Sequence, residues 1–129
     1  MKPETNIKIA INGFGRIGRN LFRLLLNHPT IEVVAINDIA DNKTMAHLVK
    51  YDSIHGVLNH KVSFSDDSII IDEKSFLFFH EREIKNLDWK SLNVDIVIES
   101  TGKFKTFEEI NQHILVGAKK VILSAPSEV

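Results

Sequence analysis

The sequence contains no cysteine among its 129 residues. Disulfide bonds, thiolate metal sites and a cysteine nucleophile are therefore excluded within this chain. Two kinds of apolar segment are also missing. No run is long enough to span a membrane, and none follows the N-terminus in the manner of a signal peptide. These absences lead us to expect a cytoplasmic protein with no membrane partner.

An excess of charge of one sign is absent as well. The 16 lysine and arginine residues nearly balance the 17 aspartate and glutamate residues, which gives a formal net charge of −1. We therefore expect no nucleic-acid partner, because such a partner requires a basic surface. The composition, 43% hydrophobic and 26% charged, is that of a soluble globular protein. A chain of this length forms one domain and can bury roughly two-thirds of its unfolded surface.

Metal-ligand spacing is also missing. The histidines are interpreted as surface or capping residues, and they are His28, His47, His55, His60, His80 and His113. The acidic pairs Asp66-Asp67 and Asp72-Glu73 are interpreted as turn residues between strands rather than a cation site. The phenylalanines in Ser75–Phe79 are expected in the core rather than in a binding surface. We expect no metal site.

The most informative segment of the sequence is Ile7–Gly18. Its isoleucines alternate with Lys8 and Ala10, which is the period of a β-strand. Gly13-x-Gly15-x-x-Gly18 follows at once, and from Ile17 the apolar residues take helical spacing. A strand, a glycine turn and a helix in this order are the context in which such a motif binds a dinucleotide.

Each glycine of the motif has a physical role in that interpretation. Gly13 allows a sharp turn, Gly15 allows the backbone to approach a pyrophosphate, and Gly18 allows close packing of helix on sheet. The amides of Gly15, Arg16 and Ile17 would lie at a helix N-terminus, where they and the helix dipole favour an anion. A tight turn without a ligand is the alternative interpretation.

The second strand ends beside an acidic residue. The apolar run Glu32–Asn37 is typical of a parallel strand covered on both faces. Asp38 follows it, about 20 residues after Gly18, where such domains place an acid that accepts hydrogen bonds from the adenosine ribose. Its charge would repel a 2′-phosphate, so Asp38 favours NAD over NADP. Alternatively, Asp38 only opens the turn before the next helix.

The first half of the chain otherwise follows local rules. We predict helices over Arg16–Asn27 and from Asp41 or Asn42 to Lys50, with Met45, Leu48 and Val49 facing inward. A loop is predicted over Tyr51–Gly56. The middle of the chain is predicted to form a β-meander over Val62–Ser65, Ser68–Ile71 and Phe76–Phe79. A helical turn at Leu87–Trp89 is expected to pack its indole on the domain.

The second half returns to alternating strands and helices. Strands are predicted over Val94–Ser100 and Lys120–Leu123. The helix between them has a capping box, Thr106 with Glu109, and ends at Gly117. Its expected buried stripe comprises Phe107, Ile110 and Ile114.

The whole pattern predicts a doubly wound α/β domain. Ligands of such domains bind beyond the carboxyl ends of the strands. Small or polar segments follow these ends, at Gly13–Gly18, Asp38, Ser100–Gly102 and Ser124–Ala125. We expect these segments to converge on one crevice.

Several blocks in this order resemble the glyceraldehyde-3-phosphate dehydrogenase family over essentially the whole chain. The blocks are Ile11–Arg19, Ala35–Asp38, Lys50–Gly56, Glu81-Arg82, Glu99–Gly102 and Ser124–Pro126. The resemblance implies a Rossmann-like, mostly parallel sheet with a short β-meander insertion. It also implies that residues 1–129 are the NAD-binding domain at the N-terminal part of a longer enzyme.

The resemblance also implies roles for single residues. The amides of Arg16 and Ile17 resemble the pyrophosphate site, Asp38 with Asn37 the ribose site, and Arg82 the adenine contact. Ser100, Thr101, Gly102 and Phe104 resemble the wall along the cofactor, and Ser124 the nicotinamide end. The predicted cofactor site comprises Asn12, Gly13, Gly15, Arg16, Ile17, Asn37, Asp38, Arg82, Ser100, Thr101, Gly102, Phe104 and Ser124.

The family oxidises and phosphorylates an aldehyde, transferring hydride to NAD, as a cytoplasmic, glycolytic homotetramer. Its catalytic cysteine and histidine match no residue of this chain, so we expect the chain alone to be inactive. Erythrose-4-phosphate dehydrogenase is the enzyme alternative, although that family often has Glu where Asp38 stands. A non-catalytic nucleotide-binding module is the other alternative, if the gene ends at Val129.

Overall fold

A computed structural model of the protein describes residues 6–52, 56–57 and 60–124. Within these residues, one sheet contains β1 (Ile7–Asn12), β2 (Ile31–Asn37), β5 (Val62–Phe64), β6 (Ser68–Ile71), β7 (Lys74–Phe79), β8 (Ile96–Glu99) and β9 (Lys120–Leu123). The helices are α1 (Arg16–Leu25), α2 (Asn42–Lys50), α3 (Phe107–Leu115) and the short 3-10 helix η1 (Ile84–Asn86). A separate hairpin pairs β3 (Tyr51–Asp52) with β4 (Gly56–Val57).

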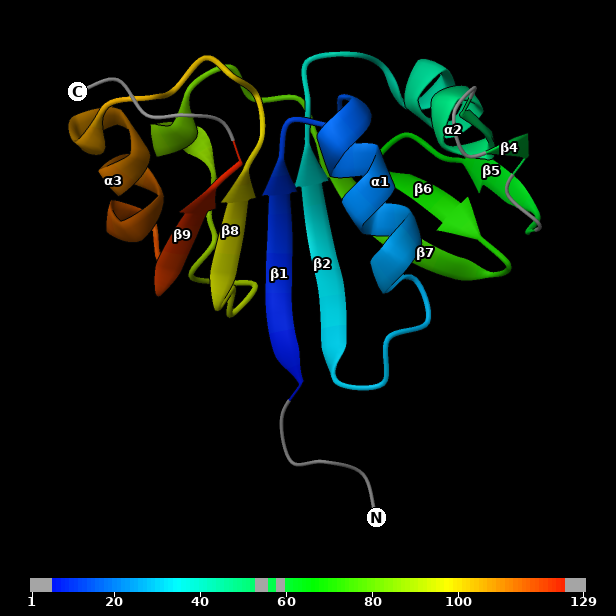
Figure 1. The fold of residues 1–129 in the computed structure, drawn as a ribbon, viewed down its shortest axis with the longest axis horizontal. Coiled ribbons are helices and arrows are strands. Elements are labelled where there is room, and N and C mark those ends of the chain that lie inside the picture. The colour runs from blue at the N-terminus through cyan, green and yellow to red at the C-terminus, as the bar shows by residue number, and fades with distance from the viewer. Residues whose placement is uncertain (1–5, 53–55, 58–59, 125–129) are drawn as a thin grey trace.

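The strand order is β5-β6-β7-β2-β1-β8-β9 (Figure 1). Neighbouring strands in the series β7-β2-β1-β8-β9 pair in parallel, whereas β5 with β6 and β6 with β7 pair antiparallel. The predicted mostly parallel sheet with a β-meander is therefore confirmed. Because the parallel strands point the same way, the carboxyl ends of β1, β2 and β8 meet at one edge, the upper edge in Figure 1.

Two hydrophobic cores cover the two faces of the sheet. Consecutive strand residues point to opposite faces, and accordingly Ile9 and Ile11 belong to one core while Ala10 belongs to the other. The first core includes Phe22 of α1 and Met45 of α2. Burial on both faces explains why the strands read as continuous apolar runs.

Several local predictions differ from the structure, including the strand predicted over Val94–Ser100, which is limited to Ile96–Glu99. The first helix ends at Leu25, not Asn27, and two turn residues separate it from His28. The segment predicted as a loop over Tyr51–Gly56 instead starts and ends in β3 and β4, with residues 53–55 outside the described part. The helical turn lies at Ile84–Asn86, just before the predicted Leu87–Trp89, although the indole is buried as expected.

The predicted buried stripe of α3 is wrong at two of its three residues, whereas Ile110 is half-buried. Phe107 is 80% exposed and Ile114 is 38% exposed, whereas His113 is completely buried. With 3.6 residues per turn, a face centred on His113 leaves Phe107 and Ile114 on the flanks of the helix. The interpretation of every histidine as a surface or capping residue therefore fails at His113. His55 lies outside the described residues.

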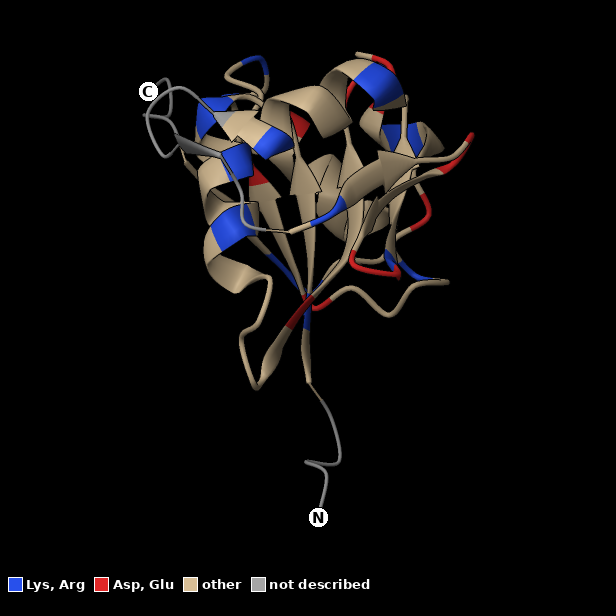
Figure 2. Ribbon diagram, turned by 90° about the vertical axis from the view of Figure 1, so that its right-hand side faces the viewer, with Lys and Arg blue, Asp and Glu red and all other residues tan. Residues whose placement is uncertain are grey.

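The surface of the described part carries both signs of charge. In the ribbon of Figure 2, most lysine and arginine positions lie towards the left and most aspartate and glutamate positions towards the right, with both kinds between them. No helix among the described residues combines the length and the apolar character needed to cross a bilayer.

Candidate functional site

The glycine turn after β1 is fixed by contacts within the chain. Gly13 has φ +98°, and a Cβ there would lie 2.6 Å from the Thr101 nitrogen. A Cβ on Gly18 would lie 2.2 Å from the Gly13 carbonyl oxygen. At Gly15, in contrast, a Cβ would have no atom of the described chain within 4 Å. The fold thus requires glycine at the first and third positions, and open space lies beside the second.

The turn leads into a helix end without a capping side chain. Gly15 is the N-cap of α1, and it makes no side-chain capping hydrogen bond. The other two α-helices are capped, α2 by Asp41 and α3 by the Thr106–Glu109 capping box. The first turn of α1 also has no acidic residue. Its amides and the helix dipole therefore favour an anion from outside the chain.

Asp38 links the end of β2 to the glycine turn. One carboxylate oxygen accepts a 2.7 Å hydrogen bond from the backbone N–H of Phe14, and the other accepts a 3.0 Å bond from the N–H of Ala40. The second bond is the turn-opening role considered above. A carboxylate has about four acceptor sites, so Asp38 also retains the capacity to accept hydrogen bonds from hydroxyl groups.

Buried polar side chains form the floor between β1 and β8. The carboxylate of Glu99, fully buried, accepts hydrogen bonds from the Asn12 amide at 2.7 Å and from Nε2 of His113 at 2.8 Å. The N–H and hydroxyl of Thr101 donate to its other oxygen at 3.0 and 2.6 Å. Nδ1 of His113 accepts from the Trp89 indole at 3.0 Å.

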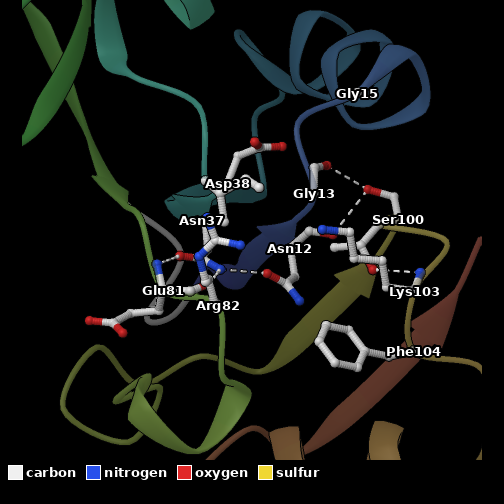
Figure 3. Close-up of a pocket in the computed structure, with 12 residues that line it drawn as sticks. Asn12, Gly13, Gly15, Asn37, Asp38, Glu81, Arg82, Ser100, Lys103 and Phe104 are labelled. Carbon is white, nitrogen blue, oxygen red and sulfur yellow. Dashed lines mark hydrogen bonds between the residues drawn. The ribbon is translucent and has the colours of Figure 1, made fainter.

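The floor continues from Asn12 towards β7. Asn37 donates to the side-chain oxygen of Asn12 at 2.8 Å. Asn37 also donates to the Glu81 carbonyl at 2.9 Å and accepts from the Glu81 N–H at 2.8 Å (Figure 3). Asn37 thus fixes the backbone immediately before Arg82.

These elements enclose a pocket of about 320 Å³ at the carboxyl edge of the sheet, within the range of small-molecule sites. Figure 3 shows Arg82 and Lys103 approaching it from opposite sides. Its lining contains most of the predicted site: Asn12, Gly13, Gly15, Asn37, Asp38, Arg82, Ser100, Thr101 and Phe104. Ile39, Glu81 and Lys103 also line it and were not predicted. Each of the three adjoins a predicted residue in the sequence, and Glu81 also belongs to the block Glu81-Arg82 that carries the family resemblance.

The remaining predicted residues lie at the same edge but outside the lining. Arg16 and Ile17 are exposed at the tip of α1, and Gly102 has φ +72° in the turn after β8. Ser124 follows β9, and its hydroxyl donates to the Glu99 carbonyl at 3.1 Å. Ala125 and Pro126 lie outside the described residues. Within the described chain, no group of three or more histidine, aspartate or glutamate residues is arranged to hold a metal ion.

The parallel order β7-β2-β1-β8-β9, with a glycine turn at β1 and an acid after β2, defines a dinucleotide-binding domain of the Rossmann class. The sequence model described as "Glyceraldehyde 3-phosphate dehydrogenase, NAD binding domain" matches residues 7–107. The chain belongs to the glyceraldehyde-3-phosphate dehydrogenase family, as its NAD-binding domain.

Similar proteins carry the same family name. The glyceraldehyde-3-phosphate dehydrogenase of Geobacillus stearothermophilus is 51% identical over 95% of this chain and 36% of its own length. That of Mycoplasma pneumoniae is 51% identical over 99% of this chain and 38% of its own length. That of Thermotoga maritima is 50% identical over 94% of this chain and 37% of its own length. The chain spans just over a third of the length of these relatives.

The residues present fit NAD. The open space beside Gly15 is where a pyrophosphate can approach the backbone. The uncapped tip of α1 supplies donors for an anion, and Asp38 supplies an acceptor for hydroxyl groups.

Proposed function

We propose that this chain is the N-terminal cofactor-binding domain, residues 1–129, of a phosphorylating glyceraldehyde-3-phosphate dehydrogenase. In this proposal the whole enzyme is a cytoplasmic homotetramer of glycolysis that oxidises the aldehyde to an acyl phosphate. Membership of the family and relatives of this name support the proposal. NAD accepts the hydride when it is bound. The observation that carries the proposal is the position of Asp38 beside an uncapped glycine turn.

The proposed cofactor contacts follow the predicted site. The amides after Gly15, those of Arg16 and Ile17, hold the pyrophosphate, and Asp38 accepts the adenosine ribose hydroxyls. Arg82 contacts the adenine end. Three sets of residues complete the site: Asn12, Gly13 and Asn37 in its floor, Ser100, Thr101, Gly102 and Phe104 in the wall along the cofactor, and Ser124 at the nicotinamide end. Inclusion of most of them in one pocket supports this assignment.

The chain alone is proposed to bind NAD without turnover. Its 129 residues contain no cysteine, so they cannot supply the thiolate of the family's covalent chemistry. A catalytic domain in the remainder of a longer polypeptide would supply it. Turnover of glyceraldehyde 3-phosphate by the purified 129-residue chain would contradict this part of the proposal.

Titration of NAD and NADP against the wild-type protein and Asp38→Asn tests the ribose assignment. Asparagine retains a neutral acceptor for the Phe14 N–H but removes the charge. A hydrogen bond to a charged group contributes about 1.5–3 kcal/mol, so we expect NAD to bind Asp38→Asn about tenfold to a hundredfold more weakly. The preference for NAD over NADP should also fall. Equal affinity of the wild-type protein for both cofactors would refute the assignment.

The substrate is tested on the full-length gene product. We expect kcat/KM for glyceraldehyde 3-phosphate to exceed that for erythrose 4-phosphate, and the reverse order would favour the alternative enzyme. A gene that stops at Val129 would favour the non-catalytic module.

A further inference from the structure

The hydrogen bonds among the buried polar side chains beneath the pocket can be assigned a donor and an acceptor at each step. The Trp89 indole can only donate a hydrogen bond, so Nδ1 of His113, 3.0 Å away, must accept it. The proton of the neutral imidazole is then on Nε2, which donates to Glu99 at 2.8 Å. All three side chains are completely buried. The hydrogen bond from Trp89 therefore determines which nitrogen of His113 faces the carboxylate.

Glu99 in turn determines how the side chains of the pocket are oriented. An ionised carboxylate only accepts hydrogen bonds, so the Asn12 side chain must turn its NH₂ group towards Glu99 and its oxygen towards Asn37. Asn37 then uses its amide to bind the backbone of Glu81, next to Arg82. The same carboxylate holds the N–H and hydroxyl of Thr101. One buried group thus orients residues on two walls of the pocket.

We propose that Glu99 and His113 are positioning residues for the dinucleotide, although His113 does not line the pocket. This inference rests on the proposed binding of NAD in the pocket above them. His113 completes the set of donors around Glu99, and Glu99 holds Asn12 and Thr101 where the cofactor meets them. Asn12 and His113 both donate to Oε1 of Glu99. Removal of the His113 donor therefore releases one side of the carboxylate, which can shift together with Asn12 and Thr101.

Two substitutions at one position separate this role from general core stability. In His113→Gln, the terminal NH₂ group of the new side chain lies at about the reach of Nε2, so the variant keeps a donor for Glu99. His113→Asn is shorter; its side-chain oxygen can replace Nδ1 as the acceptor for Trp89, but it leaves Glu99 one donor short. Both variants replace a buried ring with an amide. A purely structural role would therefore affect the two variants similarly.

The measurement is the Kd for NAD by titration calorimetry. We expect His113→Gln to bind within about twofold of the wild-type protein and His113→Asn to bind about tenfold more weakly. Val94→Ala is the matched control, because Val94 is 1% exposed in the same core and has no polar side-chain atom. It should lower the melting temperature and leave Kd unchanged. Equal Kd values for the two His113 variants would overturn the inference.

A second measurement needs no variant. The indole N–H resonance of Trp89, the single tryptophan of the chain, should shift during an NAD titration of the ¹⁵N-labelled protein, with the same Kd as calorimetry gives. A resonance that stays fixed at saturating NAD would overturn the inference. If the wild-type protein binds no NAD at all, the proposed function fails. If NAD binds and depends on Asp38 while His113→Gln and His113→Asn bind it alike, only the positioning role fails.

Discussion

The three glycines of the turn satisfy different requirements, which substitution by alanine can separate. Gly13 has a left-handed backbone, and a Cβ there would meet the Thr101 backbone at 2.6 Å. We expect Gly13→Ala to destabilise the protein by about 2–4 kcal/mol, from strain and overlap together. Thermal unfolding measures this loss.

Gly15→Ala should weaken NAD binding and leave the stability nearly unchanged, in contrast to Gly13→Ala. The added methyl group meets nothing within 4 Å in the described chain, so stability should change by less than about 1 kcal/mol. The methyl group enters the space proposed for the pyrophosphate, and NAD should bind at least about tenfold more weakly. Gly117→Ala is the control, since Gly117 also has a positive φ, +118°, but lies outside both the pocket lining and the proposed cofactor site. It should lower the stability and leave NAD binding unchanged. If Gly15→Ala binds NAD normally, the pyrophosphate lies elsewhere.

At the residue scale, the site residues that could be predicted are those whose positions follow from the ends of strands. Gly13 follows a strand and Asp38 ends the next, so their proximity was predictable from strand order alone. Glu99 and His113 were not identified as part of the site, because their contact depends on the rotation of α3 against β8. Nothing in a sequence distinguishes a histidine that is buried among partners from an exposed one. Lys103 was missed for a related reason, since a turn lysine is usually solvated.

Among the elements, the β6–β7 hairpin contains an avoidable strain. Ile71 pairs with Lys74, which leaves Asp72 and Glu73 as the two turn residues, with φ of +49° and +76°. Such turns favour Asp-Gly. We expect Glu73→Gly to stabilise the protein by about 1 kcal/mol, because glycine removes the left-handed strain while its unfolded-state entropy offsets part of the gain.

The change is measured as an increase of roughly 2–5 °C in melting temperature. Glu83→Gly is the matched control, because Glu83 is exposed but has an ordinary φ of −104°. We expect Glu83→Gly to lower the free energy of unfolding by about 0.5–1 kcal/mol. If both variants lose stability equally, the turn is not strained.

The start of α3 should carry part of the acid sensitivity of the protein. The Thr106 hydroxyl, followed by the backbone N–H groups of Thr106 and Lys105, lowers the pKa of Glu109 below its ordinary value of 4.5. The folded-state pKa is thus below the unfolded one. Its stabilisation is present above about pH 4.5 and is lost as the pH falls through the folded-state pKa.

Glu109→Gln therefore should melt at a lower temperature than the wild-type protein at pH 7, and the difference should shrink below pH 4.5. Glu108→Gln removes a charge from the same first turn without touching the capping box, so it controls for the helix dipole. If the difference between Glu109→Gln and the wild-type protein is the same at pH 3 and pH 7, the capping-box carboxylate is not responsible.

At the element scale, the type of each long element followed from periodicity, and its orientation did not always follow. The strand around Ile9 was evident from the alternation of its isoleucines with Lys8 and Ala10, and the strand around Ile98 from its apolar run. The Thr106–Glu109 box fixed the start of α3, but the apolar spacing of Phe107 and Ile114 pointed to the wrong face. The helix is rotated so that His113 contacts Trp89 and Glu99. Hydrophobic periodicity considers only the spacing of apolar residues, so it could not predict an orientation determined by buried hydrogen bonds.

On the scale of the whole molecule, large apolar side chains are exposed on the β9 side of the sheet. Phe107 and Leu115 on α3 are 80% and 77% exposed, and Ile122 on β9 is 52% exposed. The strand β9 is also the last in the sheet order among the described residues. Since this chain spans just over a third of the length of the relatives, we expect further polypeptide to cover these side chains in the proposed full-length enzyme.

The 129-residue chain by itself should therefore self-associate through α3 and β9, since apolar surface of this kind drives association. The double variant Phe107→Ser, Leu115→Gln should be more monomeric in sedimentation velocity. Its melting temperature should change little, because both side chains are mostly exposed and contribute little burial. Leu24→Ser is the matched control, with 78% exposure on α1, away from β9. If Leu24→Ser reduces association as strongly as the double variant, the contact is not specific to the β9 side. A wild-type chain that stays monomeric at high concentration would contradict the expected self-association.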